Sequence, residues 1–243
     1  SFVFIDDNPV ECGEVRARCP EVLTLLWPQD PDAALSLLRH TWELDVCAAT
    51  GEDARRTEMY REEFRRQELR DDALSFGDFI ASLRLEVETT PMTAEDLPRA
   101  SQLTLRTNQF NFTTRRRDEA ELRTLVTDGA HAVHTVKVRD RFGDYGLVGL
   151  LIVDRRTDVW DVDTFLLSCR VLGRGVEHRM AAFAGACAAE SGARAVRFRL
   201  DTTRKNTPAR RFLESLAPSG SARADARGLE CEIDAAVLAD DTA

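Results

Sequence analysis

A short stretch in the second half of the chain restricts the possible fold more than any other. An apolar run at residues 164–167 leads into a turn that contains Gly173 and Gly175, and an alanine-rich helical pattern follows at residues 176–191. Glycine lets backbone N–H groups approach an anion closely, and the N-terminus of a helix adds a partial positive charge. The order of strand, glycine turn and helix therefore predicts an α/β domain with an anion-binding turn.

The turn also carries charged and reactive side chains. Arg170 and Arg174 add two full positive charges, and Cys169 lies directly before them. A cysteine beside cationic groups is expected to be more reactive than an isolated one. The alternative is a buried structural cysteine before a loop, because free cysteine is among the most buried residue types. The two arginines and the Gly-x-Gly pattern favour the functional interpretation of Cys169.

The rest of the second half predicts a sheet with flanking helices. Two alternating runs are joined by a glycine-containing hairpin signal at residues 140–146. The polar and aromatic stretch at residues 107–114 is either a binding loop, with amides for hydroxyl or carbonyl groups, or a turn. The expected elements are helices at 93–105, 118–128 and 206–213 and strands at 132–139, 147–154, 159–167, 195–200 and 230–237.

The first half predicts a βαβα alternation, which is typical of a parallel doubly wound domain. The strand at residues 2–5 is continuously apolar and is expected to be fully buried. A long charged helix at 54–70 is expected to have solvated faces, and Pro91 follows a strand at 86–90 as a domain boundary. We therefore expect domains at 1–90 and 91–243. The other expected elements are helices at 10–19, 32–42 and 75–83 and a strand at 22–26.

Two adjacent carboxylates, Asp6 and Asp7, follow the first strand. Open α/β sheets bind ligands at the carboxyl ends of their strands, and carboxylate oxygens suit Mg²⁺. A turn in which Asp7 or Asn8 caps the next helix explains the same residues. Both interpretations are open at this level.

Charge and cysteine usage exclude some classes of function. The formal charge of the 243 residues is −9, which argues against general nucleic-acid binding because that binding depends on neutralising phosphates. The arginine runs at 115–117 and 204–205 still allow a small phosphorylated ligand or an acidic partner.

Six scattered cysteines without metal-ligand spacing suit a reducing cytoplasm, and no long apolar span indicates a membrane protein. Because residue 1 is not Met and a strand pattern begins at once, we expect a piece of a longer polypeptide.

The order of elements from 93 to 238 resembles the GNAT acyltransferase fold. In that family an Arg-x-x-Gly-x-Gly turn holds the pyrophosphate or phosphopantetheine arm of the acyl carrier. The resemblance implies this role for Arg170, Gly173, Arg174 and Gly175. Many GNAT enzymes have a tyrosine in the last helix to protonate the leaving thiolate, but residues 212–213 are Phe-Leu here. This departure argues against direct amine acetylation and favours a covalent route through Cys169.

The sequence FIDDN at residues 4–8 resembles the final acidic motif of haloacid dehalogenase-like (HAD) phosphatases. In that superfamily the motif helps to hold Mg²⁺, so the resemblance implies that Asp6 and Asp7 would hold it if the missing lobe of the domain is supplied. The earlier motifs, which include the Asp-x-Asp nucleophile, do not occur in this sequence. Without them the chain cannot remove a phosphate by the HAD mechanism.

Four motifs in order, FIDDNPVE, TNQFNFTT, DRFGDYGLVG and SCRVLGRGVE, resemble the FkbH-like family of polyketide biosynthesis. Members of that family take 1,3-bisphosphoglycerate, remove its phosphates and load the glyceryl unit as a thioester on an acyl carrier protein. The resemblance implies an α/β chain in which the C-terminal part of a HAD-like doubly wound domain precedes a GNAT-like α/β acyltransferase domain.

Under this hypothesis the Cys169 thiolate attacks the acyl phosphate, and the phosphopantetheine thiol of the carrier collects the glyceryl group. Asn108, Gln109 and Asn111 are candidates for binding the glyceryl hydroxyls. His134 and His178 are candidate bases, although a lone histidine is more often structural. Two alternatives are a non-catalytic GNAT-like module that binds a carrier protein, and an acetyl-CoA-dependent N-acetyltransferase.

Overall fold

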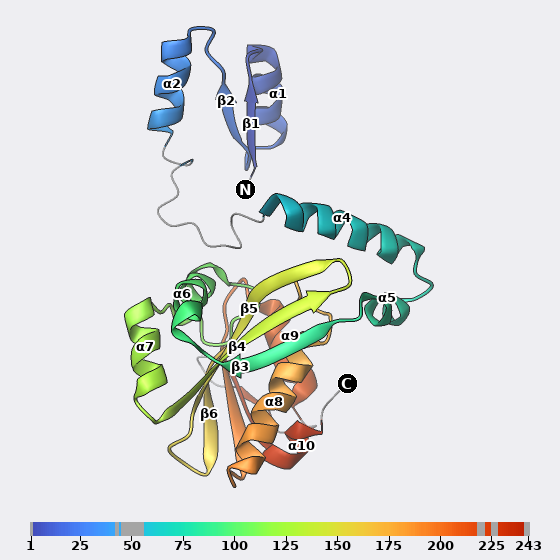
Figure 1. Ribbon diagram of the computed structural model, residues 1–243, viewed down its shortest axis with the longest axis vertical. Helices are drawn as coiled ribbons and strands as arrows, with labels where there is room; N and C mark the ends of the chain where they lie inside the picture. The colour runs from blue at the N-terminus through green and yellow to red at the C-terminus, as the bar shows by residue number, and fades with distance from the viewer. Residues whose placement is uncertain (1, 42–43, 45–55, 218–221, 225–227, 241–243) are drawn as a thin grey trace. The chain divides into compact units, whose positions relative to one another are not determined.

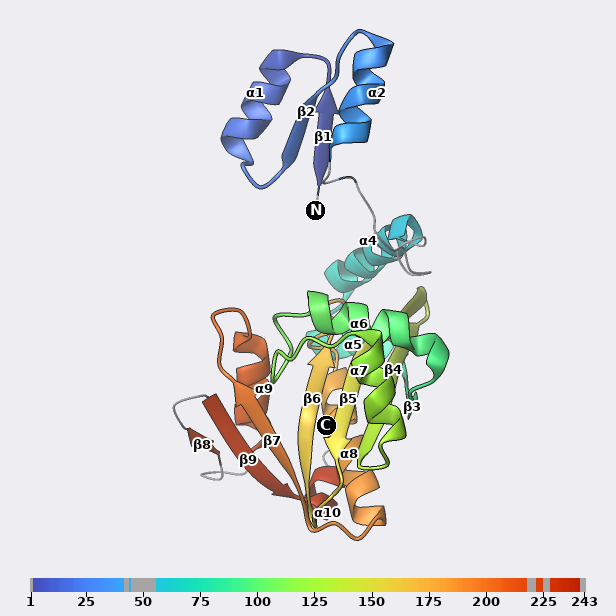
Figure 2. The ribbon, with the colours of Figure 1, turned by 90° about the vertical axis from the view of Figure 1, so that its left-hand side faces the viewer.

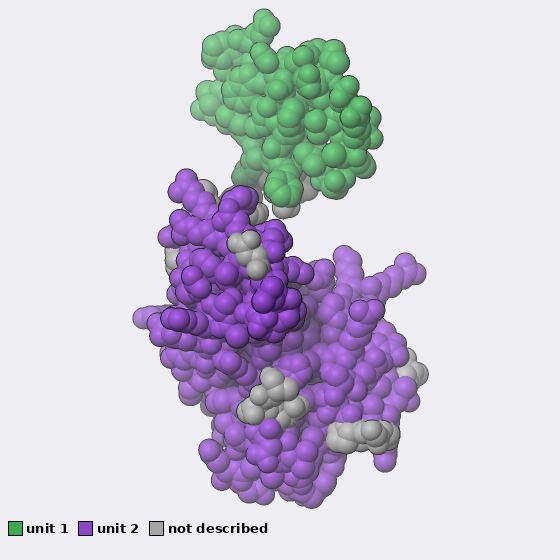
Figure 3. Space-filling model, turned by 90° about the vertical axis from the view of Figure 1, so that its right-hand side faces the viewer, with its two compact units in different colours: residues 1–49 green, residues 50–243 purple. Residues whose placement is uncertain are grey.

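The computed structural model describes residues 2–41, 44, 56–217, 222–224 and 228–240. The chain divides into two compact units, residues 1–49 and 50–243 (Figure 3). The expected boundary at residue 90 falls inside the larger unit. The reason is that β3 (Glu86–Pro91) pairs along its whole length with β4 (His131–Asp140) and so belongs to the large sheet.

The smaller unit has the expected βαβα order. Its elements are β1 (Val3–Asp6), α1 (Pro9–Arg18), β2 (Leu23–Leu26) and α2 (Pro31–His40), and the two strands are parallel. The expectation that the first strand is fully buried is wrong: Phe2 is 72% exposed and Ile5 is 44% exposed. Two strands and two short helices have too little apolar surface to enclose them. These four elements do not by themselves show a HAD-like domain.

The larger unit is a mixed α/β structure with a mostly antiparallel sheet in the order β3-β4-β5-β6-β7-β9-β8 (Figure 2). The predicted meander β4-β5-β6 is confirmed, and β6 and β7 form a parallel pair joined through α8. The remaining elements are α4 (Arg56–Asp72), α5 (Phe76–Leu83), a 3₁₀ turn (Ala94–Asp96), α6 (Leu97–Arg106), α7 (Glu119–Thr127), β5 (Gly143–Asp154), β6 (Val159–Leu167), α8 (Val176–Glu190), β7 (Ala195–Asp201), α9 (Thr207–Leu216), β8 (Arg223–Ala224), β9 (Gly228–Asp234) and α10 (Ala235–Ala239).

Side-chain caps decide where several of these helices begin. Asp118 and Glu121 form a reciprocal capping box at the start of α7. Asp234 accepts hydrogen bonds from the backbone N–H groups of Ala236 and Val237, so the chain turns into α10 there. The expected final strand at 230–237 is therefore wrong in its last three residues, because the aspartate cap ends β9.

Apolar side chains cover the sheet in two clusters. One contains residues of α8, α9 and α10 against β5, β6, β7 and β9, and the other packs α6 and α7 on β4, β5 and β6. α8 packs closely on α10 (Figure 1). A Cβ added at Gly185 of α8 would lie 2.6 Å from the backbone nitrogen of Ala239. This close approach requires a glycine.

β6 and β7 are side by side (Figure 2), but their ladder covers only Val159–Val162 of β6. Beyond it, the segment 110–112 occupies the opening between the two strands. The backbone N–H of Phe112 donates to Phe165 O at 3.1 Å, and that of Leu167 donates to Phe110 O at 3.0 Å. On the other side, the N–H of Asp201 donates to Phe112 O at 2.8 Å. The backbone of segment 110–112 therefore provides hydrogen-bond partners for β6 and for the end of β7 where the two strands separate.

Candidate active site

The turn between β6 and α8 has the conformation that its glycines predict. Gly173 has φ +75° and Gly175 has φ +80°, in the left-handed region that other residues rarely adopt. Gly175 is also the residue immediately before the first turn of α8. The strand, turn and helix expected from the sequence are confirmed as a local structure.

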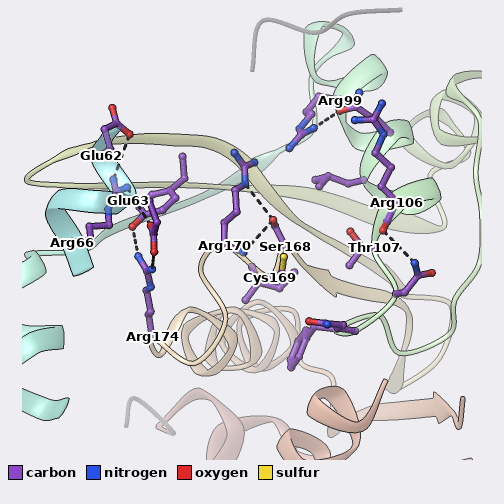
Figure 4. Close-up of a pocket in the computed structure, with 17 residues that line it drawn as sticks. Glu62, Glu63, Arg66, Arg99, Arg106, Thr107, Ser168, Cys169, Arg170 and Arg174 are labelled. Carbon is purple, nitrogen blue, oxygen red and sulfur yellow. Dashed lines mark hydrogen bonds and ion pairs between the residues drawn. The ribbon is translucent and has the colours of Figure 1, made fainter. Parts of the chain in front are cut away.

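A pocket of about 700 Å³ opens beside this turn (Figure 4). Its walls come from α4, α6, the segment after α6, β5 and the start of the turn. Five arginines and two glutamates line the pocket, so its lining carries a net positive charge that favours an anionic ligand. The lining includes Glu62, Glu63, Arg66, Arg99, Gln102, Leu103, Arg106, Asn108, Gln109, Tyr145, Ser168, Cys169, Arg170 and Arg174.

Cys169 contributes an exposed thiol to this pocket. The hydroxyl of Ser168, the preceding residue, accepts a long hydrogen bond from Arg170 Nε at 3.4 Å. Arg174, at the end of the turn away from Cys169, also lines the pocket (Figure 4). The structure therefore brings the predicted nucleophile and both predicted arginines to one cavity.

α4 supplies a charged wall that the sequence does not predict. Arg66 is only 2% exposed, and its Nε and Nη2 donate to the two carboxylate oxygens of Asp140 at 2.7 and 3.0 Å. Glu62 Oε2 and Glu63 Oε2 each lie 3.5 Å from the Arg66 guanidinium. The expectation that this helix has solvated charged faces is wrong for Glu62 and Arg66, because Asp140 gives the arginine a buried partner.

Tyr145 connects this wall to the turn. Two guanidinium groups contact its ring: Arg66 Cζ lies 4.2 Å and Arg174 Cζ 5.3 Å from the ring centroid. Its hydroxyl donates to Asp140 Oδ2 at 2.8 Å and accepts from Arg174 Nη1. Burial raises the pKa of Tyr145 more than the two neighbouring arginines lower it, so the phenol stays protonated. Asp140 and Tyr145 thus hold the Arg174 side chain in place.

α6 supplies the opposite wall. Arg99, Gln102, Leu103 and Arg106 line the pocket and recur at the three- and four-residue spacing of one helical face. The two glutamates of the lining both belong to α4. The side of the pocket formed by α6 is therefore its more cationic side.

Asn108 and Gln109 line the pocket, but Asn111 does not. Asn111 is fully buried; its side chain donates to Thr107 O at 3.3 Å and accepts from the N–H of Thr114 at 3.0 Å. These bonds shape the segment that enters the opening between β6 and β7. Asn111 is therefore structural, and the prediction that it binds substrate is corrected.

Neither candidate histidine reaches the pocket. His134 packs edge-on against Phe183 with ring centroids 4.9 Å apart, and His178 packs edge-on against Phe212 at 5.0 Å. Burial lowers the pKa of His134, and the charge of Arg155 lowers it further. The geometry supports the structural interpretation of both histidines and gives neither a role at Cys169.

Gly173 and Gly175 shape the turn but do not line the pocket. The backbone N–H of Gly173 donates to Glu177 Oε1 at 3.1 Å. A carboxylate of the chain itself therefore takes a position at the turn where a phosphate oxygen was expected. Glu177 gives no functional signal in the sequence, because a glutamate in the first turn of a helix is an ordinary finding.

Asp6 and Asp7 do not form a metal site with the described residues. Asp6 Oδ1 accepts from the N–H of Asn8 at 2.8 Å, and Asn8 Oδ1 accepts from the N–H of Val10 at 3.0 Å to cap α1. In the described parts of the chain, no three His, Cys, Asp or Glu side chains come close enough to hold a metal ion. The described residues by themselves assemble no Mg²⁺ site, and Asp6 and Asn8 form the capped turn.

The arginine run at 115–117 is also structural. Arg115 and Arg117 form ion pairs with Asp163, and Arg116 donates to Thr104 O and Thr107 O. The arginines of the pocket instead come from α4, α6 and the turn. Arg170 and Arg174 of the turn were predicted from the sequence; for the arginines of the two helices, the seven-residue spacing of Arg99 and Arg106, which places both on one helical face, is the one sequence signal.

A scan against protein-family models finds no match, and neither does a search of curated proteins. Solved structures similar to this chain include the ribosomal-protein-S18-alanine N-acetyltransferase from Escherichia coli, with a TM-score of 0.44 and 12% identity over 61% of this chain and 92% of that one. The PaiA N-acetyltransferase from Thermoplasma acidophilum in complex with coenzyme A has a TM-score of 0.48 and 10% identity over 61% and 99%. A putative acetyltransferase of the GNAT family from Desulfovibrio desulfuricans has a TM-score of 0.46 and 13% identity over 62% and 99%.

Across the described residues, none of the helices combines the length and apolar character needed to cross a bilayer.

Proposed function

We propose that the pocket transfers an acyl group through a thioester on Cys169. The observation that supports this proposal is the exposed Cys169 thiol in a cavity of about 700 Å³ whose lining is rich in arginine. A thiol is an intrinsically strong nucleophile, and a covalent intermediate divides a difficult transfer into two easier steps. The cationic lining suits a phosphorylated acyl donor.

In the first step the sulfur of Cys169 attacks the carbonyl carbon of an acyl phosphate. A carbon–sulfur bond forms, the carbon–oxygen bond to phosphate breaks, and the thiol proton leaves with the phosphate. In the second step the thiol of a carrier attacks the thioester carbon, the acyl group moves to the carrier sulfur, and Cys169 regains its proton. Both steps are balanced without an oxidant or reductant.

The FkbH-like resemblance specifies the partners in this scheme. The donor would be 1,3-bisphosphoglycerate and the acceptor the phosphopantetheine thiol of an acyl carrier protein. Asn108 and Gln109 would bind the glyceryl hydroxyls. Arg170 and Arg174 would hold phosphate oxygens, since guanidinium groups bind phosphate through paired N–H donors.

We assign no phosphatase step to this chain, because its described residues do not fit a metal site. The acyl phosphate itself releases one phosphate when Cys169 is acylated. Removal of the other phosphate of the donor would need groups beyond those described.

Intact mass spectrometry tests the proposal. The protein is incubated with 1,3-bisphosphoglycerate, and we expect a glyceryl or phosphoglyceryl adduct that hydroxylamine removes, as it does a thioester. Cys169→Ala should abolish the adduct. Cys187→Ala, which changes a half-buried cysteine of α8, is the matched control and should keep it. An adduct that survives in Cys169→Ala would overturn the proposal.

The wild type and Cys169→Ala also distinguish the two alternatives when they are given a phosphopantetheinylated carrier protein, or acetyl-CoA with an amine. A carrier-binding module would retain a phosphopantetheinylated carrier protein but never form an adduct. An acetyl-CoA-dependent N-acetyltransferase would acetylate amines at a rate that Cys169→Ala leaves unchanged. Either result would replace the proposal with that alternative.

A further inference from the structure

The turn before α8 contains an anion that belongs to the chain. Glu177 Oε1 accepts the backbone N–H of Gly173 at 3.1 Å, and the Glu177 residue is only 6% exposed. Its second oxygen, Oε2, is buried and has no hydrogen-bond partner among the described residues. A carboxylate in this position benefits from the partial positive charge of the helix N-terminus.

This carboxylate changes which ligands the turn accepts. The left-handed glycines at 173 and 175 lead directly into the start of α8. The backbone N–H groups of such a turn and helix N-terminus would by themselves suit a phosphate or a diphosphate. With Glu177 in place, an incoming diphosphate would lie against a buried negative charge. Like charges repel strongly where little water screens them.

The neighbouring part of the sheet gives independent support. An extended ligand could pair with the backbone of β6 where β6 and β7 part, but the segment 110–112 already occupies that opening. The rings of Phe110 and Phe112 are 1% and 0% exposed, so this segment is part of the core. An extended thiol arm therefore cannot reach Cys169 along β6, whereas the arginine-lined pocket opens directly on the thiol.

We propose that Glu177 is a specificity-determining residue that excludes diphosphate-containing carriers, such as free coenzyme A, from the turn before α8. A thiol arm with a single phosphodiester, as on a carrier protein, would instead enter through the arginine-lined pocket. This inference rests on the proposed function for the identity of the thiol arm. It replaces the expectation that Gly173 and Gly175 hold the arm.

Direct binding measurements test the inference on the full chain without any acyl donor. Isothermal titration compares coenzyme A with pantetheine 4′-phosphate on the wild type and on Glu177→Gln. Glutamine keeps an oxygen that can accept from Gly173 but removes the charge. We expect the variant to bind coenzyme A about tenfold more tightly or better, the change that corresponds to about 1.4 kcal/mol. Its affinity for pantetheine 4′-phosphate should change less than threefold.

Glu190→Gln is the matched control, because it removes the same charge from an exposed position at the other end of α8. It should leave both affinities unchanged. Equal coenzyme A affinity in the wild type and Glu177→Gln would overturn the inference. Tighter binding of coenzyme A than of pantetheine 4′-phosphate by the wild type would also overturn it, and this comparison needs no variant to fold.

These outcomes are independent of the acylation test. If Cys169 is never acylated but Glu177→Gln gains affinity for coenzyme A, the proposed function fails while the role of Glu177 stands. If acylation occurs and the affinities do not change, the reverse holds.

Discussion

Replacing Asp140 with Asn tests the buried network that forms one wall of the pocket. The Asp140 side chain is 0% exposed. It accepts two hydrogen bonds from Arg66 at 2.7 and 3.0 Å and one from the Tyr145 hydroxyl at 2.8 Å. It also accepts from the backbone N–H groups of Phe142 and Gly143 at 2.9 and 3.0 Å. Asparagine has the same shape but only one side-chain oxygen and no charge.

The expected cost follows from what Asp140→Asn leaves behind. Removing one partner of a buried ion pair typically costs about 3–5 kcal/mol, because the other charge stays buried. Arg66 would remain 2% exposed, with two glutamate oxygens 3.5 Å from its guanidinium. These glutamates compensate part of the charge, so we expect a loss of unfolding free energy near the lower limit, about 3 kcal/mol.

Urea unfolding measures this loss in the larger unit alone. Trp160 is buried in its core, and replacing Trp27 and Trp42 with Phe makes Trp160 the only fluorescent tryptophan. Asp144→Asn is the matched control, since Asp144 belongs to the same hairpin but is exposed. The control should lose less than about 1 kcal/mol, the usual range for surface charges. An equally small loss for Asp140→Asn would refute our account of the wall.

The same variant has a pH signature. Burial raises the pKa of Asp140, but the hydrogen bond from Arg66, with those from Phe142 and Tyr145, outweighs it and holds the pKa below its ordinary value. A carboxyl whose pKa is lower in the folded state stabilises the fold above its unfolded pKa of about 4, and this contribution disappears as the pH falls further. The wild type should therefore lose stability below about pH 4 more steeply than Asp140→Asn.

Two further predictions concern α8 and β4. Gly185→Ala should cost about 1–3 kcal/mol, because the new Cβ would lie 2.6 Å from Ala239 N and displace α10. Gly77→Ala in α5 of the same unit is the control: its new Cβ would lie 3.7 Å from Ser75 Oγ, an ordinary contact, so it should cost nothing in the same urea assay. Burial and the charge of Arg155 lower the pKa of His134, so the wild type should lose stability as the pH falls below about 6.5. His134→Gln should reduce that loss between about pH 7 and pH 5. Thermal unfolding of both proteins across this range measures the effect, and an equal loss of stability in both would contradict the assignment to His134.

Local patterns in the sequence predicted the elements of the fold well. The meander of β4, β5 and β6, the glycine turn and the extent of α8 all appear as expected. Each depends on side-chain alternation, helical periodicity or a left-handed glycine, and these act within a few residues. The error at the end of β9 has the same local origin, because an aspartate cap outweighed an apolar pattern.

The candidate site was predicted only in part. Cys169, Arg170 and Arg174 are adjacent in the sequence, and the structure places all three in the pocket. Asn111 and His134 have side chains that can bind substrate or move a proton, but in the structure they make backbone and packing contacts instead. A single side chain does not show from the sequence whether it faces a cavity or the core.

Neighbouring residues specify the strand, turn and helix around Cys169, so this part of the site can be predicted from the sequence. The rest of the pocket depends on how distant segments of the chain pack together. Arg66 meets Asp140 across 74 positions of sequence, and α4 and α6 place their charges on opposite walls. Likewise, Glu177 acts as an anion at the turn only because α8 buries it there. Burial and charge pairing depend on which distant segments pack together, and the local periodicity of the sequence does not predict that packing.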